Sequence, residues 1–190
     1  MNKNGFSQEL SSALIKRAKA NDIKAFEDIY RTYSSAAYTL ALRICRDSML
    51  AQDVVQNAFI RIMKVIKQYR GEGSFAGWIR RIIVNETINA VRQKKKIQLV
   101  TTEEVGELES RDLFDDNWLN SCRDLEYLLA KLSDEQRAVL LLHEVEGYNH
   151  REIGKLYEKS ESFSKVTLCR AYKKLKEIAK RQEVEYALNR

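Results

Sequence analysis

The fold that we expect follows from one segment, residues 53–96, which reads DVVQNAFIRIMKVIKQYRGEGSFAGWIRRIIVNETINAVRQKKK. Its first part has apolar residues at helical spacing, which predict a helix with one buried face: Val55, Phe59, Ile62 and Ile66. A loop with Gly71 and Gly73 follows, and Ser74 at its end is a suitable N-cap for a second helix. The segment therefore predicts two helices joined by a short loop.

The second helix of this segment carries a polar, cationic stripe. Its members recur at steps of three and four: Arg81, Asn85, Asn89, Arg92 and Lys96. Ile79, Ile83 (or Ile82) and Val91 are expected to face inward. Arginine suits phosphate and guanine, and asparagine suits adenine edges. Such a stripe beside a loop with aromatic residues at its edges favours the reading of exposed bases over a plain charged surface.

The composition of the whole chain indicates an all-α protein. Its 190 residues include no proline and only seven glycines, and they suffice for one or two domains. No apolar run approaches the ~20 residues that span a bilayer, and the first residues lack the apolar core of a signal peptide. We therefore expect a cytoplasmic protein.

The reactive residue types predict no catalytic or metal site. Cys45, Cys122 and Cys169 are odd in number and far apart, and they match no disulfide or zinc spacing. Plain reduced thiols are the favoured interpretation, with redox sensing as the alternative. The chain has two histidines, no recognisable nucleophile motif and no glycine-rich phosphate loop on a strand. We expect no enzyme activity, no cofactor, no metal and no small-molecule substrate.

Charge divides the chain into three blocks. Residues 1–96 hold 18 Lys and Arg against 8 Asp and Glu, residues 97–126 hold 2 against 9, and residues 127–190 hold 13 against 10. The acidic block can be a solvated linker between two helical domains, or its acids can compete with nucleic acid for a basic channel. The acids in question are Glu103, Glu104, Glu107, Glu109, Asp112, Asp115 and Asp116.

The domain organisation follows from periodicity and capping signals. We expect a first domain over residues 1–96, with helices near 10–20 and 23–45 ahead of the segment quoted above, then a flexible acidic linker over 97–122. The second domain, 123–190, begins with an apolar stripe made of Leu125, Leu128, Leu129 and Leu132. Ser133 to Gln136 form a capping box that opens a helix over 135–146.

A helix-turn-helix is predicted at the end of the second domain. A short helix over 149–156, a turn at 158–161 and a basic helix over 162–180 have the layout in which the second helix enters the major groove. The inward positions of that helix are Ser164, Leu168, Ala171, Leu175 and Ile178. The positions left facing outward are Phe163, Lys165, Val166, Thr167, Arg170 and Lys173.

Two sets of motifs resemble bacterial sigma factors, specifically the small extracytoplasmic-function (ECF) type. Those of region 2 are Ala51-Gln52-Asp53-Val54-Val55-Gln56 with Phe59, Tyr69-Arg70-Gly71, Ser74-Phe75, Gly77-Trp78 and Asn85-x-x-Ile88-x-x-x-Arg92. Those of region 4 are Glu146-Gly147-Tyr148, Glu152-Ile153-Gly154, Ser160 to Lys165, and Leu168-x-Arg170-Ala171. The chain departs from the family at Gln52 and Asn89, usually acidic, at Ala76, commonly basic, and at Phe163, Val166 and Thr167, commonly small or polar.

The resemblance implies three binding surfaces. Core RNA polymerase would bind Asp53, Gln56, Asn57, Phe59, Ile60 and Lys64. The −10 element of promoter DNA would be bound by Tyr69, Arg70, Ser74, Phe75, Arg80, Arg81, Asn85, Asn89, Arg92 and Lys96. The −35 element would be bound by Arg151, Ser162, Phe163, Lys165, Val166, Thr167, Arg170 and Lys173.

Alternatives remain open for single residues and for the whole chain. Trp78 can pack in the core, which its spacing favours, or stack on a flipped base, and Tyr69 and Phe75 can do either. His143 is expected to pack on its apolar helix, and His150 to be an exposed residue that opens one. The rival to a sigma factor is a stand-alone helix-turn-helix regulator that binds duplex DNA without polymerase. A third interpretation, a basic RNA-binding protein, finds no support, because the chain has no recognised RNA-binding sequence.

A regulatory partner is the last expectation from the sequence. The chain shows no sensory segment of its own, so a sigma factor of this type would need outside control. We expect an anti-sigma protein, membrane-anchored where the signal comes from outside the cell, that wedges between residues 1–96 and 123–190.

Overall fold

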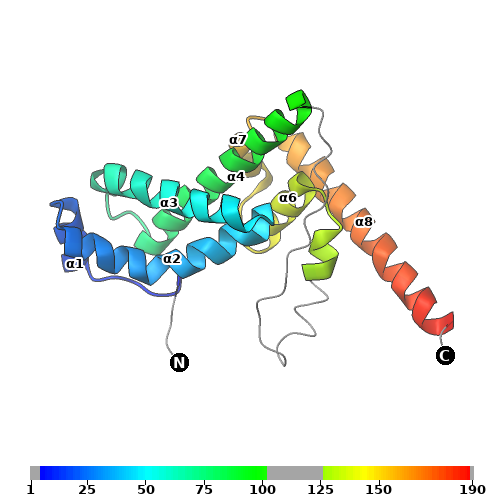
Figure 1. Ribbon diagram of the computed structural model, residues 1–190, viewed down its shortest axis with the longest axis horizontal. Helices are drawn as coiled ribbons and strands as arrows, with labels where there is room; N and C mark the ends of the chain where they lie inside the picture. The colour runs from blue at the N-terminus through cyan, green and yellow to red at the C-terminus, as the bar shows by residue number, and fades with distance from the viewer. Residues whose placement is uncertain (1–4, 102–125, 189–190) are drawn as a thin grey trace. The chain divides into compact units, whose positions relative to one another are not determined.

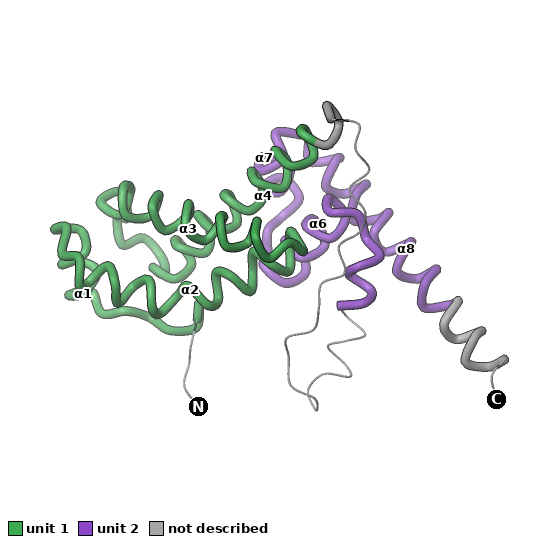
Figure 2. The backbone as a smooth tube through the Cα atoms, viewed as in Figure 1, with its two compact units in different colours: residues 1–104 green, residues 105–190 purple. Residues whose placement is uncertain are grey.

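The computed structural model describes residues 5–101 and 126–188, which form helices and no strand (Figure 1). The chain divides into two compact units, residues 1–104 and residues 105–190 (Figure 2). The prediction of an all-α protein with two helical parts is confirmed. Residues 102–122 of the expected linker lie outside the described residues.

Unit 1 consists of α1 (Ser12–Lys19), α2 (Ile23–Cys45), α3 (Ser48–Val65), a short 3₁₀ helix η1 (Ile66–Gln68) and α4 (Phe75–Thr101). Side chains that precede the first three helices accept hydrogen bonds from their first-turn amides: Ser11, Asp22 and Asp47. α2 has the predicted bounds. α3 begins upstream of the predicted Asp53, because Asp47 caps it, and α4 includes residues 97–101, which we assigned to the linker.

The core of unit 1 lies between α2, α3 and α4, which pack against one another (Figure 1). Each helix contributes large side chains that are almost fully buried: Ile29, Tyr33 and Ile44 from α2, Ile62 from α3, and Ile79, Ile83 and Ile88 from α4. Burying an isoleucine or tyrosine of this size contributes roughly 1.5–3 kcal/mol. The predicted inward residues Ile79, Ile83 and Val91 are confirmed as buried.

Unit 2 has helical residues at 126–130, followed by α6 (Asp134–Glu144), α7 (His150–Leu156) and α8 (Glu161–Leu188). The predicted capping box at Ser133 is present, with Gln136 as its other member. A second capping box, which the sequence analysis missed, joins Asn149 and Glu152 at the start of α7. α6 and α7 both pack against α8.

The predicted inward face of α8 is the one that meets the core of unit 2. Ser164, Leu168 and Ala171 are buried, and Leu175 and Ile178 are half-buried. α7, the following turn and α8 therefore form the predicted helix-turn-helix.

Candidate polymerase- and DNA-binding surfaces

The outer face of α3 carries most of the residues that we predicted to bind polymerase. Asp53, Gln56, Asn57, Ile60 and Lys64 are all exposed. Phe59 is not: it is 3% exposed, and its ring lies edge-on to Tyr30 with centroids 4.8 Å apart. Its burial confirms the predicted apolar face of the helix, and it corrects the expectation, implied by the resemblance, that Phe59 lies on the binding surface, because its ring packs between α3 and α2.

Two further residues extend this face. Met49 and Met63 are 76% and 54% exposed, and Ile60 is 48% exposed. The spacing of four, three, four and three residues places one row along α3: Met49, Asp53, Gln56, Ile60 and Met63. We call this row the α3 face. Sequence reasoning missed both methionines; the same helical spacing could have found Met63, whereas Met49 lies ahead of the predicted start of the helix at Asp53. Exposed apolar side chains with polar neighbours are typical of a protein-binding surface.

The loop between η1 and α4 is shaped by its two glycines and by Tyr69. Gly71 and Gly73 have φ values of +83° and +79°, which residues other than glycine rarely adopt. The Tyr69 hydroxyl donates a hydrogen bond to the Gly73 carbonyl at 2.7 Å, which closes the loop on itself. Arg70 and Ser74 remain exposed. Ser74 accepts a hydrogen bond from the Gly77 amide, as predicted for the N-cap of α4.

The aromatic residues at the loop form a cluster within unit 1. Phe75 is 1% exposed and Tyr69 is 9% exposed. Trp78 stacks on Phe75 with centroids 5.7 Å apart and lies 5.6 Å from the Tyr69 ring, and Tyr33 meets Phe75 edge-on. Of the two alternatives for Tyr69 and Phe75, the structure has packing in the core, because aromatic neighbours cover both rings. Their expected place among the residues that bind the −10 element is therefore corrected. Trp78 is half-buried, so it is the ring of this cluster with a partly open surface.

The residues of α4 beyond Phe75 that we predicted to bind the −10 element, the cationic stripe and Arg80, divide by exposure. Arg81, Asn89 and Lys96 are exposed, whereas Arg80, Asn85 and Arg92 are half-buried.

Two ion pairs tie other residues of α4 to the rest of unit 1. Glu86 pairs with Arg61 of α3, and the Lys94 Nζ lies 2.9 Å from an Asp47 carboxylate oxygen. The Leu50 amide, and then Lys94, hold the pKa of Asp47 below its ordinary value. The α4 helix is thus fixed on one side, while Arg81, Asn89 and Lys96 of its stripe remain exposed.

The outward face of α8 differs from the prediction at two positions. Six of the predicted residues are exposed: Arg151 on α7, and Ser162, Lys165, Val166, Arg170 and Lys173 on α8. Thr167 is 8% exposed, because it lies beside Leu168 and Ser164 on the face that meets the core. Phe163 is half-buried against the Tyr157 ring, 5.2 Å away, with the Lys159 ammonium 4.1 Å above its centroid. These contacts correct the expectation that Thr167 and Phe163 face DNA freely.

The turn of the helix-turn-helix brings the backbone close to Gly154. A methyl group there would lie 2.9 Å from the carbonyl oxygens of Lys159 and Ser160. The Lys159 amide donates to the Gly154 carbonyl at 2.8 Å, and Glu158 in the same turn has φ of +54°. Only glycine fits this approach without a backbone shift.

The two histidines stack on each other in unit 2. His143 is packed, as predicted, and His150 begins α7, as predicted, but His150 is half-buried rather than exposed. Their ring centroids are 4.4 Å apart, and both are half-buried. The His150 Nδ1 lies 3.0 Å from the Ser164 hydroxyl of α8, and the His143 Nδ1 lies 2.7 Å from a Glu144 carboxylate oxygen. Burial lowers the pKa of His150, and the nearby His143 and Lys165 lower it further.

The described residues contain no group of three His, Cys, Asp or Glu side chains that could hold a metal ion. Cys45 is buried and Cys169 is exposed, both as free thiols, and Cys122 lies outside the described residues. Among the helices of residues 5–101 and 126–188, none combines the length and hydropathy needed to cross a membrane.

The fold and these surfaces define a helical protein of the nucleic-acid-binding class, with a helix-turn-helix in one unit and an Arg/Asn stripe in the other. Residues 29–97 match the family model of sigma-70 region 2, and residues 122–175 match that of sigma-70, region 4. The chain therefore belongs to the sigma-70 family, and its relatives place it in the ECF type.

Two relatives illustrate the similarity. The ECF RNA polymerase sigma factor SigE of Mycolicibacterium smegmatis is 29% identical over 136 residues, which are 68% of this chain and 52% of SigE. The RNA polymerase sigma factor CarQ of Myxococcus xanthus is 26% identical over 163 residues, which are 86% of this chain and 94% of CarQ. The chain thus spans about half the length of SigE and almost all of CarQ.

Two solved structures share the fold. The sigma factor RpoE of Bartonella quintana, in complex with the anti-sigma factor NepR, has a TM-score of 0.59 at 19% identity and covers 83% of this chain and 98% of its own. CnrH, in complex with the cytosolic domain of CnrY, has a TM-score of 0.52 at 18% identity and covers 89% and 96%.

Proposed function

We propose that this chain is an ECF sigma factor that binds core RNA polymerase, directs it to specific promoters and helps to melt the −10 element. The observation that carries the proposal is the presence of sigma-70 regions 2 and 4 in one chain, in that order. The rival, a stand-alone helix-turn-helix regulator, explains unit 2 but gives no reason for a region 2 match. Sigma factors are regulatory subunits, so we expect this chain to catalyse no reaction of its own. We expect it to act in the cytoplasm with core polymerase.

The α3 face is the proposed contact with core polymerase. Exposed Ile60 and Met63 supply apolar area, and Asp53 and Gln56 supply polar groups that orient the partner. Interfaces of this kind have an apolar centre and a polar rim. Lys64 and Asn57 lie at the side of the same helix and belong to that rim.

Unit 1 is also proposed to hold the −10 element. Arg81, Asn89 and Lys96 on the exposed part of the α4 stripe can bind phosphates and base edges. Arg70 and Ser74, also exposed, are the proposed contacts of the loop with the DNA. Taking a base out of the stack costs a few kcal/mol, which contacts to the displaced strand must offset. The partly open ring of Trp78 is the aromatic surface on which such a base could stack.

Unit 2 is proposed to bind the duplex −35 element through α8. Lys165 and Arg170 are exposed on the helix that a helix-turn-helix places in the major groove. Lys173 is exposed further along the same helix, where it can contact the phosphate backbone of the DNA. Val166 is 47% exposed and can contact a thymine methyl group.

An anti-sigma protein is the proposed regulator. RpoE and CnrH, which share the fold, were each solved with a protein partner. We propose that a partner of this chain covers the α3 face together with a surface of unit 2, and so excludes polymerase. A membrane-anchored partner would carry an outside signal to this chain.

Run-off transcription with core polymerase on a promoter library tests the proposed function. Core enzyme with the chain should initiate at a defined subset of promoters, and core enzyme alone should not. The chain alone should bind the same DNA weakly. Tight, sequence-specific binding by the chain alone, without any gain in initiation, would favour the stand-alone regulator.

A further inference from the structure

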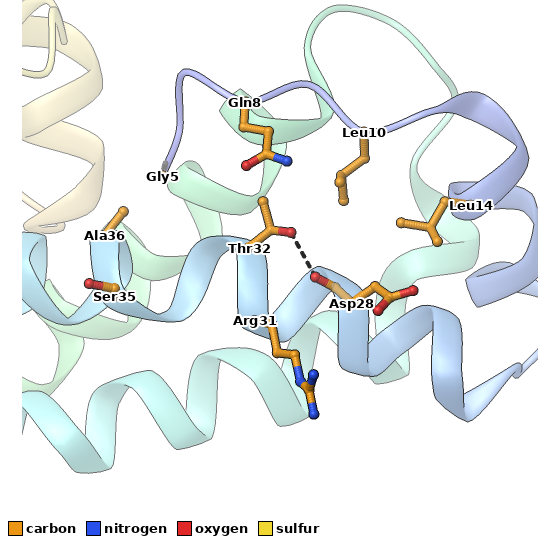
Figure 3. Close-up of a pocket in the computed structure, with 9 residues that line it drawn as sticks. All are labelled: Gly5, Gln8, Leu10, Leu14, Asp28, Arg31, Thr32, Ser35 and Ala36. Carbon is orange, nitrogen blue, oxygen red and sulfur yellow. Dashed lines mark hydrogen bonds between the residues drawn. The ribbon is translucent and has the colours of Figure 1, made fainter. Parts of the chain in front are cut away.

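The N-terminal segment from Gly5 to Lys19 lies upstream of the part of the chain that matches region 2, which begins at residue 29. It nevertheless follows a fixed path along α2 (Figure 3). Phe6 stacks on Tyr33 with centroids 6.0 Å apart, and the Tyr33 hydroxyl donates to the Gln8 carbonyl at 2.7 Å. Burial, with smaller effects of Glu9 and Tyr69, raises the pKa of Tyr33 to about 12.

Close approach also fixes the start of this segment. Gly5 is buried and has φ of +89°, and a methyl group on it would lie 2.9 Å from the Cβ of Ala36. Between the segment and α2 lies a surface hollow of about 660 Å³ that Leu10, Asp28 and Thr32 help to line (Figure 3). The hollow is lined by both polar and apolar groups, and the path of the segment beside it is set by the contacts with Tyr33 and Ala36.

Two side chains of this segment reach the loop that joins η1 to α4, one at each end of the loop. At the start, the Lys19 ammonium donates to the Tyr69 carbonyl and lies 5.3 Å from the centroid of the Tyr69 ring. At the end, the Ser74 hydroxyl donates to the Glu9 carboxylate. Ser74 is also the N-cap of α4, so its proton points to Glu9 while its oxygen accepts from Gly77.

These contacts hold the exposed tip of the loop between two clamped ends. Arg70, Gly71, Glu72 and Gly73 lie in that tip and are all exposed. The two glycines leave the tip with few conformational constraints of its own, apart from the hydrogen bond of Tyr69 to Gly73. The contacts that fix the two ends of the loop therefore determine the positions of Arg70 and Ser74 relative to bound DNA.

We propose that Glu9 and Lys19 are positioning residues for the loop between η1 and α4, residues 69–74: they set its conformation, and with it the discrimination between −10 sequences, without contacting DNA themselves. The inference rests on the proposed function. It assigns a role in promoter choice to a segment that precedes the matched family region.

Promoter selectivity is the measurement that separates positioning from mere stabilisation. A promoter taken from the run-off screen is paired with single-base substitutions in its −10 element and, separately, in its −35 element. Full-length variants Glu9→Ala, Glu9→Gln and Lys19→Met are assayed with core polymerase. Lys16→Met, on the same helix α1, and Glu27→Ala, on α2, serve as controls because both side chains are exposed and Glu27 pairs with Arg31 of its own helix.

Glu9→Ala and Lys19→Met should each reduce the preference for the selected −10 element over its substitutions by about threefold to tenfold, as expected for loss of a charge-assisted hydrogen bond. Preference at −35 should not change. Glu9→Gln, which keeps an acceptor for Ser74, should retain most of the wild-type preference. Both controls should match the wild type.

Three results would overturn the inference. In the first, Glu9→Ala and Lys19→Met select −10 sequences like the controls. In the second, they lower the melting temperature and reduce transcription from all promoters in the same proportion, which indicates a structural role alone. In the third, Glu9→Gln and Glu9→Ala raise activity alike on every promoter, which indicates that the carboxylate acts by charge repulsion of DNA. Failure of the wild-type chain to direct initiation at any promoter is a different result, and it would remove the proposed function as well.

Discussion

At the scale of single residues, the turn of the helix-turn-helix depends on one hydrogen atom. Gly154 faces the backbone of Lys159 and Ser160 so closely that a Cβ would come within 2.9 Å of two carbonyl oxygens. Backbone atoms cannot rotate away as a flexible side chain can. The start of α8 would therefore have to move relative to α7.

Gly154→Ala should lower the free energy of unfolding of unit 2 by about 1–3 kcal/mol, the usual range for overpacking. Thermal unfolding followed by circular dichroism measures the loss, and binding to the −35 element should weaken in parallel. Gly77→Ala is the matched control, because the nearest atoms to a Cβ there lie 3.8 Å away and alanine favours a helix. A Gly154→Ala protein as stable as the wild type would contradict the close approach.

Stacked His143 and His150 give a second prediction at this scale. Burial lowers the pKa of His150 from its ordinary 6.5, assisted by His143 and Lys165, against smaller opposing effects of Glu161 and Glu144. The folded chain therefore keeps His150 neutral at a pH where the unfolded chain is protonated. Its contribution to stability is complete above about pH 6.5 and is lost as the pH falls through the lowered pKa.

The melting temperature of the wild type should thus fall more between pH 7.5 and pH 5.5 than that of His150→Gln, where the group that titrates is absent. His143→Gln removes the other histidine of the chain and should give an intermediate slope. Equal slopes for the wild type and His150→Gln would show that the stack does not affect the proton affinity of His150.

At the scale of elements, α3 shows how one helix divides its two faces between folding and binding. Phe59 and Ile62 are buried, while Ile60 and Met63, one residue further along in each case, are exposed. Substitutions on the α3 face should leave the core intact. The outer face is therefore open to test without unfolding unit 1.

Asp53→Ala combined with Gln56→Ala should weaken binding to core polymerase by about tenfold, which corresponds to roughly 1.4 kcal/mol. The melting temperature should stay that of the wild type, because both side chains are exposed. The double variant Glu27→Ala with Arg31→Ala removes an exposed ion pair of α2 instead and should bind polymerase normally. Unchanged affinity of the α3 variant in a pull-down with core enzyme would remove the proposed contact.

α8 offers the same kind of contrast between neighbours. Arg170 is exposed and Thr167 is buried. Arg170→Ala should cost ~1–3 kcal/mol in binding and relax specificity only in the −35 element, if its guanidinium binds a base bidentately. Thr167→Val, which keeps the shape, should leave DNA binding unchanged. Equal weakening of all sequences with a smaller salt dependence would make Arg170 a phosphate contact instead.

At the scale of the whole molecule, the sequence predicts well the features that follow from helical periodicity and capping. It predicts less well the contacts that depend on how helices pack against one another. The bounds of α2, the N-cap Ser74, the capping box at Ser133 and the inward face of α8 all follow from local rules, and the structure has each of them. Local rules do not show which aromatic rings meet. The burial of Tyr69 and Phe75 depends on Trp78 and Tyr33, and the histidine stack joins residues of two helices.

The same limit applies to the candidate site. Contacts of the loop with Glu9 and Lys19 link residues 50 or more positions apart, and no pattern in the sequence predicts them. The α3 face, by contrast, could be predicted in large part, since helical spacing places Asp53, Gln56, Ile60 and Met63 in one row, whereas Met49 lies ahead of the predicted start of the helix. The place of Met49 on the helix and the exposure of both methionines had to come from the structure.

The charge blocks of the chain give the last prediction. Residues 1–96 have ten more basic than acidic residues, and residues 97–126 have seven more acidic than basic ones. Seven of those acids form the run from Glu103 to Asp116, which lies outside the described residues, so its expected effect rests on charge alone. If these acids compete with DNA for the basic surface of residues 1–96, their loss should strengthen DNA binding by the free chain.

A variant with all seven acids changed to amides should bind a non-specific duplex about threefold to tenfold more tightly than the wild type at ~50 mM salt. The difference should vanish near ~0.5 M salt, where the Debye length is only a few ångströms. The matched control keeps the same acids in a rearranged order within residues 97–122, and it should bind like the wild type because net charge, not position, sets the competition. Equal binding by the amide variant and the wild type at low salt would contradict competition and leave the segment as a solvated connection between the two units.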